Sequence, residues 1–255
     1  MTCIVFLGPS LAIDEASAIL DAVYRPPAAA NDVLDAVCDA PRAIVVIDGL
    51  FEQVLSVRHK EILYALSRGI RVYGAASMGA LRAAELDSFG MRGVGKIYEA
   101  YASGEYEDDD EVAVAHATTD YGCRPVSEAM VNLRWGLELA EAQRAITAAT
   151  RARLTALGKT LFYRERSWAA LLALGAGEGI PARELQSLRA FVKQTQPNRK
   201  RDDAVMVLEA VRDEVRRGDL APLPEFDLRL TRTLTEQWLG AVRSRRATAH
   251  QEIER

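Results

Sequence analysis

A serine flanked by small residues is the strongest chemical signal in this 255-residue sequence. Ser77 lies in the run GAASMGA, which begins at Gly74, where a predicted apolar strand ends and a helix begins. Small neighbours allow a serine to sit on a tight strand-to-helix turn, and the amides that follow, at Met78 and Gly79, can stabilise an oxyanion. The run resembles a nucleophile elbow, although Ala75 replaces the first glycine of the G-x-S-x-G pattern. The alternative is that Ser77 caps the helix.

A serine nucleophile needs a proton acceptor, and two candidates follow the second predicted strand. His59 and Lys60 stand early in a predicted helix, from which both can face the same edge as Ser77. Lys60 would act only in a desolvated environment that favours its neutral form, whereas His59 accepts a proton near neutral pH. Asp48, at the end of its strand, could orient either base. The alternatives are that both bases are solvated positions of an amphipathic helix and that Asp48 with Gly49 forms a turn.

A charged pair stands on the helix that begins at the serine. Arg82 and Glu85 are three residues apart, so they share a helix face and are expected to form an ion pair. The pair is either an exposed salt bridge of little energetic value or a means by which Arg82 anchors a carboxylate or carbonyl group near the serine. A second polar cluster could line the same crevice or serve only in capping and pairing. It contains Arg124, Ser127, Glu128, Asn132 and Arg134.

Three short apolar runs predict strands that are buried on both faces. The runs are residues 3–7, 43–47 and 70–73. They are rich in Ile and Val and lack polar alternation, as strands of a parallel sheet do. Helical patterns between them give the order of a Rossmann-like, doubly wound α/β fold. Because the carboxyl ends of parallel strands meet at one edge, Ser10, Asp48 and Ser77 are expected around one crevice.

The second half of the chain is predicted to be mainly helical. A fourth strand is expected over residues 112–116, with Ser127 as the N-cap of a helix that runs to about residue 147. Further helical patterns follow. The expected division is an α/β core domain at 1–127 and a helical extension at 128–255 that packs on the core.

Composition and motif content narrow the range of partners. The formal net charge of −4 argues against nucleic acid and anionic lipid. No apolar run reaches the ~20 residues of a membrane helix, and the N-terminus does not resemble a signal peptide, so a cytoplasmic location is expected.

Cys3, Cys38 and Cys123 lack paired spacing, which predicts reduced thiols. The acidic run at 108–111 predicts a solvated turn or docking patch rather than a metal site. No metal or nucleotide cofactor is expected, because no Walker loop or dinucleotide fingerprint is present.

The sequence around these residues resembles the core signature of the TfuA-like family. The matching segments are DGLF from Asp48, HKEIL from His59, GAASMGALRAAEL from Gly74 and FGM from Phe89, and the likeness extends over roughly residues 40–135. The resemblance implies a partner of a YcaO enzyme, which activates a peptide amide with ATP while sulfur replaces the oxygen. It also implies a ubiquitin-like sulfur-carrier protein that ends in a thiocarboxylate. The implied substrate of thioamidation is a RiPP-type peptide or a protein.

The residues and the resemblance together predict a serine-type thioacyl hydrolase. Ser77 would attack the thiocarboxylate with Lys60 or His59 as the base, while Arg82 would hold the carrier tail in a narrow slot of small residues. Hydrolysis would release sulfide beside the YcaO enzyme. One alternative is an adaptor without chemistry that bridges YcaO and its sulfur donor. Another is a generic serine hydrolase or peptidase, because the motif ASMGA also occurs in ClpP-type peptidases. The sequence is also compatible with a homo-oligomer.

Overall fold

The computed structural model describes residues 2–50, 54–117, 124–218 and 222–229, together with residues 231, 232, 235, 236, 238 and 240. Cys123 and Phe51 lie outside the described residues. The chain forms two compact units. Unit 1 comprises the described residues of Met1–Ser103 and Asp203–Arg255, and unit 2 comprises those of Gly104–Asp202. These bounds differ from the expected division between residues 127 and 128, because the last long helix of the chain returns to unit 1.

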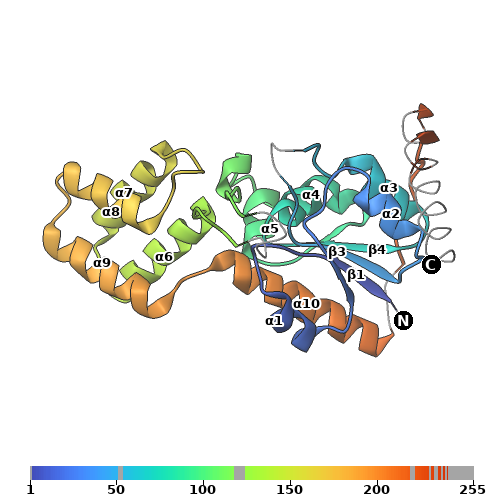
Figure 1. Ribbon diagram of the computed structural model, residues 1–255, viewed down its shortest axis with the longest axis horizontal. Coiled ribbons are helices and arrows are strands. Elements are labelled where there is room, and N and C mark those ends of the chain that lie inside the picture. The colour runs from blue at the N-terminus through green and yellow to red at the C-terminus, as the bar shows by residue number, and fades with distance from the viewer. Residues whose placement is uncertain are drawn as a thin grey trace, which may run out of the picture. The chain divides into compact units, whose positions relative to one another are not determined.

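Unit 1 is built on a five-stranded sheet in which all strands are parallel (Figure 1). The strand order is β2-β1-β3-β4-β5. The strands are β1 (Cys3–Phe6), β2 (Val23–Arg25), β3 (Ala43–Val46), β4 (Arg71–Gly74) and β5 (Arg92–Gly93). The three central strands coincide with the predicted apolar runs, and all their residues except Arg71 are buried. The Rossmann-like α/β fold predicted from the sequence is confirmed.

The two edge strands and the segment after residue 111 differ from the sequence prediction. β2 has three residues, none of them buried, and β5 has two, so neither carries the apolar run that identifies a central strand. The strand expected over residues 112–116 is wrong. After a short 3-10 helix, η2 (Asp109–Glu111), this segment forms one isolated bridge within the described residues, between His116 and Pro125. The adjacent residues Val112 and Ala113 are both buried, so the segment lacks the alternation of a half-buried strand.

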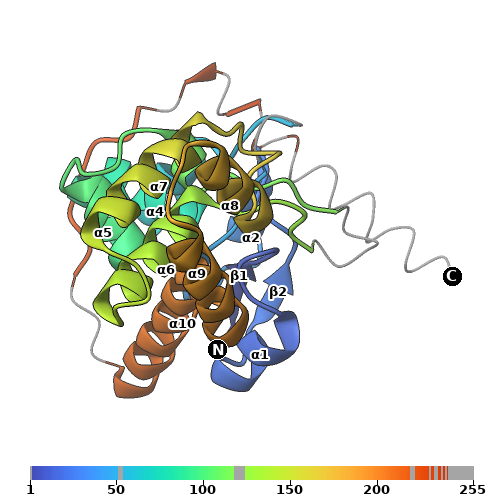
Figure 2. The ribbon, with the colours of Figure 1, turned by 90° about the vertical axis from the view of Figure 1, so that its left-hand side faces the viewer.

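Helices lie on both sides of the sheet because successive strand residues point to opposite faces. Figures 1 and 2 show α1 and α10 on one side and α4 on the other. The helices of unit 1 are α1 (Ile13–Ile19), α2 (Asp32–Val37), α3 (His59–Ser67), α4 (Met78–Leu86), α5 (Lys96–Ala102) and, from Asp203 onward, α10 (Arg199–Arg217), with a 3-10 turn η1 (Asp87–Phe89). Val207 and Leu208 of α10 pack in one core cluster with Val5, Val45 and Tyr73 of the sheet. α10 therefore supplies part of the core of unit 1.

Unit 2 is helical and has a core of its own. Its helices are α6 (Met130–Ala142), α7 (Ala148–Thr160), α8 (Trp168–Gly177) and α9 (Ala182–Thr195). Leu133, Leu154 and Leu188 are fully buried at its centre. Thr147 and Ser167 cap α7 and α8 by accepting hydrogen bonds from first-turn amides. In the described part of the chain, no helix has the length and apolar character that crossing a membrane requires.

Candidate functional site

Asp48 holds together the carboxyl edge of the sheet. It lies two residues beyond β3 and is buried. Its Oδ2 accepts hydrogen bonds from the backbone N–H groups of Gly8 (2.9 Å) and Ser10 (3.0 Å), and its Oδ1 accepts one from Ser10 Oγ (2.6 Å). The loops that follow β1 and β3 therefore lie together, as the sequence predicts. The Asp48 carboxylate orients this loop, and no hydrogen bond joins it to His59 or Lys60 in the described part of the chain.

Ser77 stands in a strained turn between β4 and α4. β4 ends at Gly74 and α4 begins at Met78. Between them, Ala76 has a φ of 64°, a left-handed conformation that residues with a Cβ rarely adopt. The Ser77 N–H donates to Ala75 O at 2.7 Å, which closes the turn. The Ser77 side chain makes no capping hydrogen bond to α4, so helix capping does not account for a serine here.

Close packing of α4 on the sheet explains the small residues around the serine. An added Cβ at Gly79 would collide with the carbonyl oxygen of Val46, and one at Gly74 would collide with the carbonyl oxygen of Gly79. An added Cβ at Gly49 would lie 2.6 Å from Met78 Cγ. Gly74, Met78 and Gly79 therefore contribute packing between the strand ends and the start of the helix. This packing fixes the turn that carries the serine.

A second polar group lies where α3 meets α4. His59 Nε2 and Glu85 Oε2 are 2.8 Å apart, and Arg82 Nη1 donates to the same Glu85 oxygen at 2.6 Å. Arg82 Nε donates to Val57 O at 3.0 Å. The expected pair of Arg82 and Glu85 is present. His59 is the third member of this polar group. It is 26 residues from Glu85 in sequence, so spacing could not reveal the bond between them. Lys60 is exposed and makes no hydrogen bond or ion pair within the described residues.

Ser77 and the His59 group do not form one hydrogen-bonded network. Among the described residues, no hydrogen bond joins Ser77 Oγ to His59, Lys60 or Asp48. Glu85 follows Ser77 by eight residues, which corresponds to a rise of about 12 Å along the helix axis. Ser77 as a whole is only 2% exposed, so little of the residue is open to solvent.

Arg124, Ser127 and Glu128 belong to unit 2. Ser127 Oγ accepts a hydrogen bond from Ala115 N at 2.8 Å, and α6 begins three residues later, so the prediction that Ser127 caps this helix is wrong. Glu128 accepts a hydrogen bond from Asn132 Nδ2 at 2.7 Å, and burial raises the pKa of Glu128. Arg124 is exposed. Ser127 and Glu128 thus support the local structure of unit 2.

The acidic run at 108–111 forms ion pairs inside unit 2. Arg134 donates two hydrogen bonds to Glu111, at 2.8 and 2.9 Å. Asp110 binds Lys159 and, at 2.7 Å, Arg166. Burial alone would raise the pKa of Asp110, but its bonds to these two cations hold it below the usual value. The run therefore anchors the helices of unit 2. No group of His, Cys, Asp or Glu in the described ranges could hold a metal ion.

The family comparison covers the residues of the serine turn and of the group around His59. The model of a family described as TfuA-like protein matches residues 48–167. The match begins at Asp48 and includes Ser77, Arg82 and Glu85. A comparison with curated proteins gives no match. The resemblance to this family seen in the sequence is confirmed.

Proposed function

Because residues 48–167 match the TfuA-like family, we propose that this chain works with a YcaO enzyme in the thioamidation of a peptide or protein. In this proposal, the chain hydrolyses the C-terminal thiocarboxylate of a ubiquitin-like sulfur carrier. The YcaO enzyme then uses the released sulfide, together with ATP, to replace the oxygen of a backbone amide. If the substrate is a peptide, it is of the RiPP type, which means that the ribosome makes it.

The strained turn at Ala76 and Ser77 is the observation that supports a catalytic role most directly. A positive φ at a residue other than glycine costs about 1–3 kcal/mol and is often retained at functional sites. Ser77 immediately precedes the first amides of α4. These amides carry partial positive charge, which is suited to stabilising a tetrahedral oxyanion.

The proposed reaction has two steps. First, Ser77 Oγ attacks the thiocarboxylate carbon and forms an ester with the carrier as the carbon–sulfur bond breaks. The serine proton passes through a base to the departing sulfur, which leaves as hydrosulfide. Water then hydrolyses the ester, restores the serine and leaves an ordinary carboxylate on the carrier. The chain needs no redox partner for this sequence.

We assign the base to His59 rather than Lys60. Glu85 orients the His59 imidazole at 2.8 Å, whereas Lys60 has no hydrogen-bonding partner among the described residues. His59 does not contact Ser77 in the structure, so this assignment requires a conformational change on carrier binding that brings the imidazole to the serine hydroxyl. Arg82, fixed by Glu85 and a backbone carbonyl, keeps further N–H donors for the carboxyl end of the carrier.

The test is sulfide release from a thiocarboxylated carrier by the purified chain, measured together with carrier affinity. Ser77→Ala is expected to lower the rate of sulfide release by about three orders of magnitude, as at other activated nucleophiles, and to leave carrier binding intact. His59→Ala should lower the rate more than Lys60→Ala. Ser17→Ala, an exposed serine on α1, is the matched control and should behave as the unmodified chain does. Full activity in Ser77→Ala would reject covalent catalysis.

The burial of Ser77 favours a second candidate function, that of an adaptor without chemistry. Because Ser77 as a residue is only 2% exposed, the chain could instead bring the carrier and the YcaO enzyme together. An adaptor would bind the carrier and release no sulfide on its own. Adding the YcaO enzyme would restore thioamidation equally well with the unmodified chain and with Ser77→Ala.

A further inference from the structure

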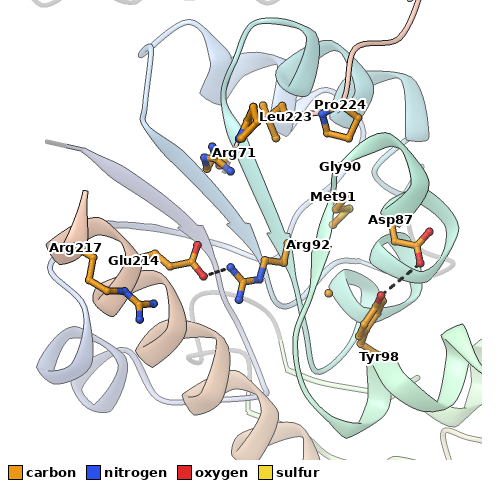
Figure 3. A pocket seen from close by; sticks show the side chains of 12 residues that line it. Arg71, Asp87, Gly90, Met91, Arg92, Tyr98, Glu214, Arg217, Leu223 and Pro224 are labelled. Atoms are coloured by element: carbon orange, nitrogen blue, oxygen red, sulfur yellow. Dashed lines mark hydrogen bonds and ion pairs between the residues drawn. The ribbon is translucent and has the colours of Figure 1, made fainter. Parts of the chain in front are cut away.

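Unit 1 contains a cavity beside the edge strand β5, lined in part by both residues of that strand (Figure 3). Its volume is about 480 Å³. Three arginines line it: Arg71 begins β4, Arg92 begins β5 and Arg217 ends α10. Leu223 and Pro224 line another part of the wall. The cavity shares no lining residue with the serine turn or with the group around His59.

Sheet geometry places two of the arginines on one face. Residues two apart in a strand share a face, so Arg71 lies on the same face as Tyr73. Tyr73 pairs with Arg92 in the register of β4 and β5, which puts Arg92 on that face as well. α10 packs over it, and its Glu214 accepts a hydrogen bond from Tyr73 Oη at 2.7 Å and forms an ion pair with Arg92.

The cavity lining carries more positive than negative charge. Its acidic residues are Glu214 and Asp87, against three arginines. Both carboxylates are already engaged, Glu214 as described and Asp87 by a hydrogen bond from Tyr98 Oη at 3.4 Å. Arg217 is exposed and makes no hydrogen bond or ion pair within the described residues. A surplus cation in a cavity of small-molecule size is suited to an anion.

We propose that this cavity binds a small organic oxyanion. Its charged group lies against the arginines, whose planar forks match the oxygens of phosphate and carboxylate. Its less polar body lies against Leu223 and Pro224. Pro224 packs tightly on the loop before β5, since an added Cβ at Gly90 would lie 2.7 Å from Pro224 Cδ. The site is independent of the proposed thiocarboxylate hydrolysis.

Calorimetric titration with phenyl phosphate and with benzoate at constant ionic strength tests the proposal. The two probes share a phenyl body and differ in the anionic group, so their relative affinities identify the preferred oxyanion. We expect saturable binding of at least one probe at one site per chain. Arg217→Gln should weaken that binding by about tenfold or more, in line with the loss of a charge-assisted hydrogen bond. Leu223→Ala should weaken phenyl phosphate more than inorganic phosphate.

Arg189→Gln is the matched control, because it removes the same charge from an exposed position on α9. It should leave probe affinity unchanged, and so should Ser77→Ala. Arg217 is exposed, so its replacement leaves the core intact, and the thermal unfolding of each variant verifies this. The absence of saturable binding of both probes would overturn the proposal. Equal losses in Arg217→Gln and Arg189→Gln would also overturn it, because they would indicate general charge attraction.

Discussion

At Gly79 the backbone of α4 passes so close to the Val46 carbonyl that no side chain fits. Gly79→Ala is therefore expected to lower the free energy of unfolding by about 3 kcal/mol, because α4 must move away from β3. Urea denaturation followed by circular dichroism measures this loss. Gly177→Ala in α8 is the control, since no atom lies within 4 Å of its added Cβ. The control should be neutral or stabilising by up to about 1 kcal/mol, and equal losses in both variants would contradict the packing argument.

Glu61 is a buried carboxyl with an incomplete set of partners. Its Oε1 accepts hydrogen bonds from the backbone N–H groups of Asn31 and Arg58, both at 3.0 Å, while its Oε2 has no described hydrogen-bond partner. Burial raises the pKa of Glu61 above the ordinary value of 4.5. The folded state therefore holds this proton more tightly than the unfolded state does. As pH rises from 4.5 through the raised pKa, the group costs stability, and above the raised pKa the cost is complete.

Glu61→Gln removes this charge and keeps an oxygen for the two backbone donors. We expect the difference in unfolding free energy, variant minus unmodified chain, to become more positive as pH rises from 4.5 through the raised pKa. Urea denaturation of both proteins at each pH measures this difference in unfolding free energy. The contributions of the other titrating groups cancel in it. A difference that stays constant with pH would show that Glu61 does not titrate abnormally.

At the level of the elements, the sequence predicts the strands that are buried on both faces. It does not predict the features that depend on which segments of the chain pair with each other. β1, β3 and β4 are identified because strands buried on both faces must be continuously apolar. β2 and β5 have too few buried residues to leave a pattern, and the alternation of small and apolar residues near Val112 has no sheet to join. The same holds for the candidate site. The meeting of Ser10 with Asp48 follows from parallel topology, whereas the bond between His59 and Glu85 depends on how two helices pack.

Substitutions at two positions of α10 test whether this helix is part of the core of unit 1. Leu208 is fully buried in the cluster that joins α10 to the sheet, and Met206, two residues earlier, is 41% exposed. Leu208→Ala is expected to lower the free energy of unfolding by about 3 kcal/mol, from lost apolar burial and the remaining cavity. Met206→Ala should change it by less than about 0.5 kcal/mol. Denaturation curves of the two variants check this, and similar losses would mean that α10 is not part of the core.

Across the whole molecule, the two units rely on different interactions. Unit 1 is organised around the apolar faces of its sheet, whereas unit 2 adds a network of buried charge. The Arg166 side chain is fully buried and donates to the carbonyl oxygens of Gly158 (3.2 Å), Asp110 (2.9 Å) and Leu161 (3.1 Å), as well as to the Asp110 carboxylate. No sequence pattern indicated this network, because its members are spread over more than 50 residues.

Arg166→Ala is expected to lower the free energy of unfolding of unit 2 by about 3–5 kcal/mol, because it leaves the partners of a buried charge without their donor. Arg189→Ala, on an exposed face of α9, should change it by less than about 0.5 kcal/mol. Thermal unfolding monitored by near-ultraviolet circular dichroism distinguishes the two. A loss below 1 kcal/mol in Arg166→Ala would mean that the network contributes little to cohesion.

The return of α10 to unit 1 affects how the protein is made. Tyr73 and Glu214, which are hydrogen-bonded in unit 1, are 141 residues apart in the chain. Because synthesis proceeds from the N-terminus, Val5 and Val45 leave the ribosome long before Val207 exists to cover them. Unit 2 lies entirely within the intervening segment and has its own core, so it can fold while the face of the sheet that α10 covers is still covered only by α1. During that interval part of the apolar surface of the sheet is uncovered, and an uncovered apolar surface makes a nascent chain prone to aggregation.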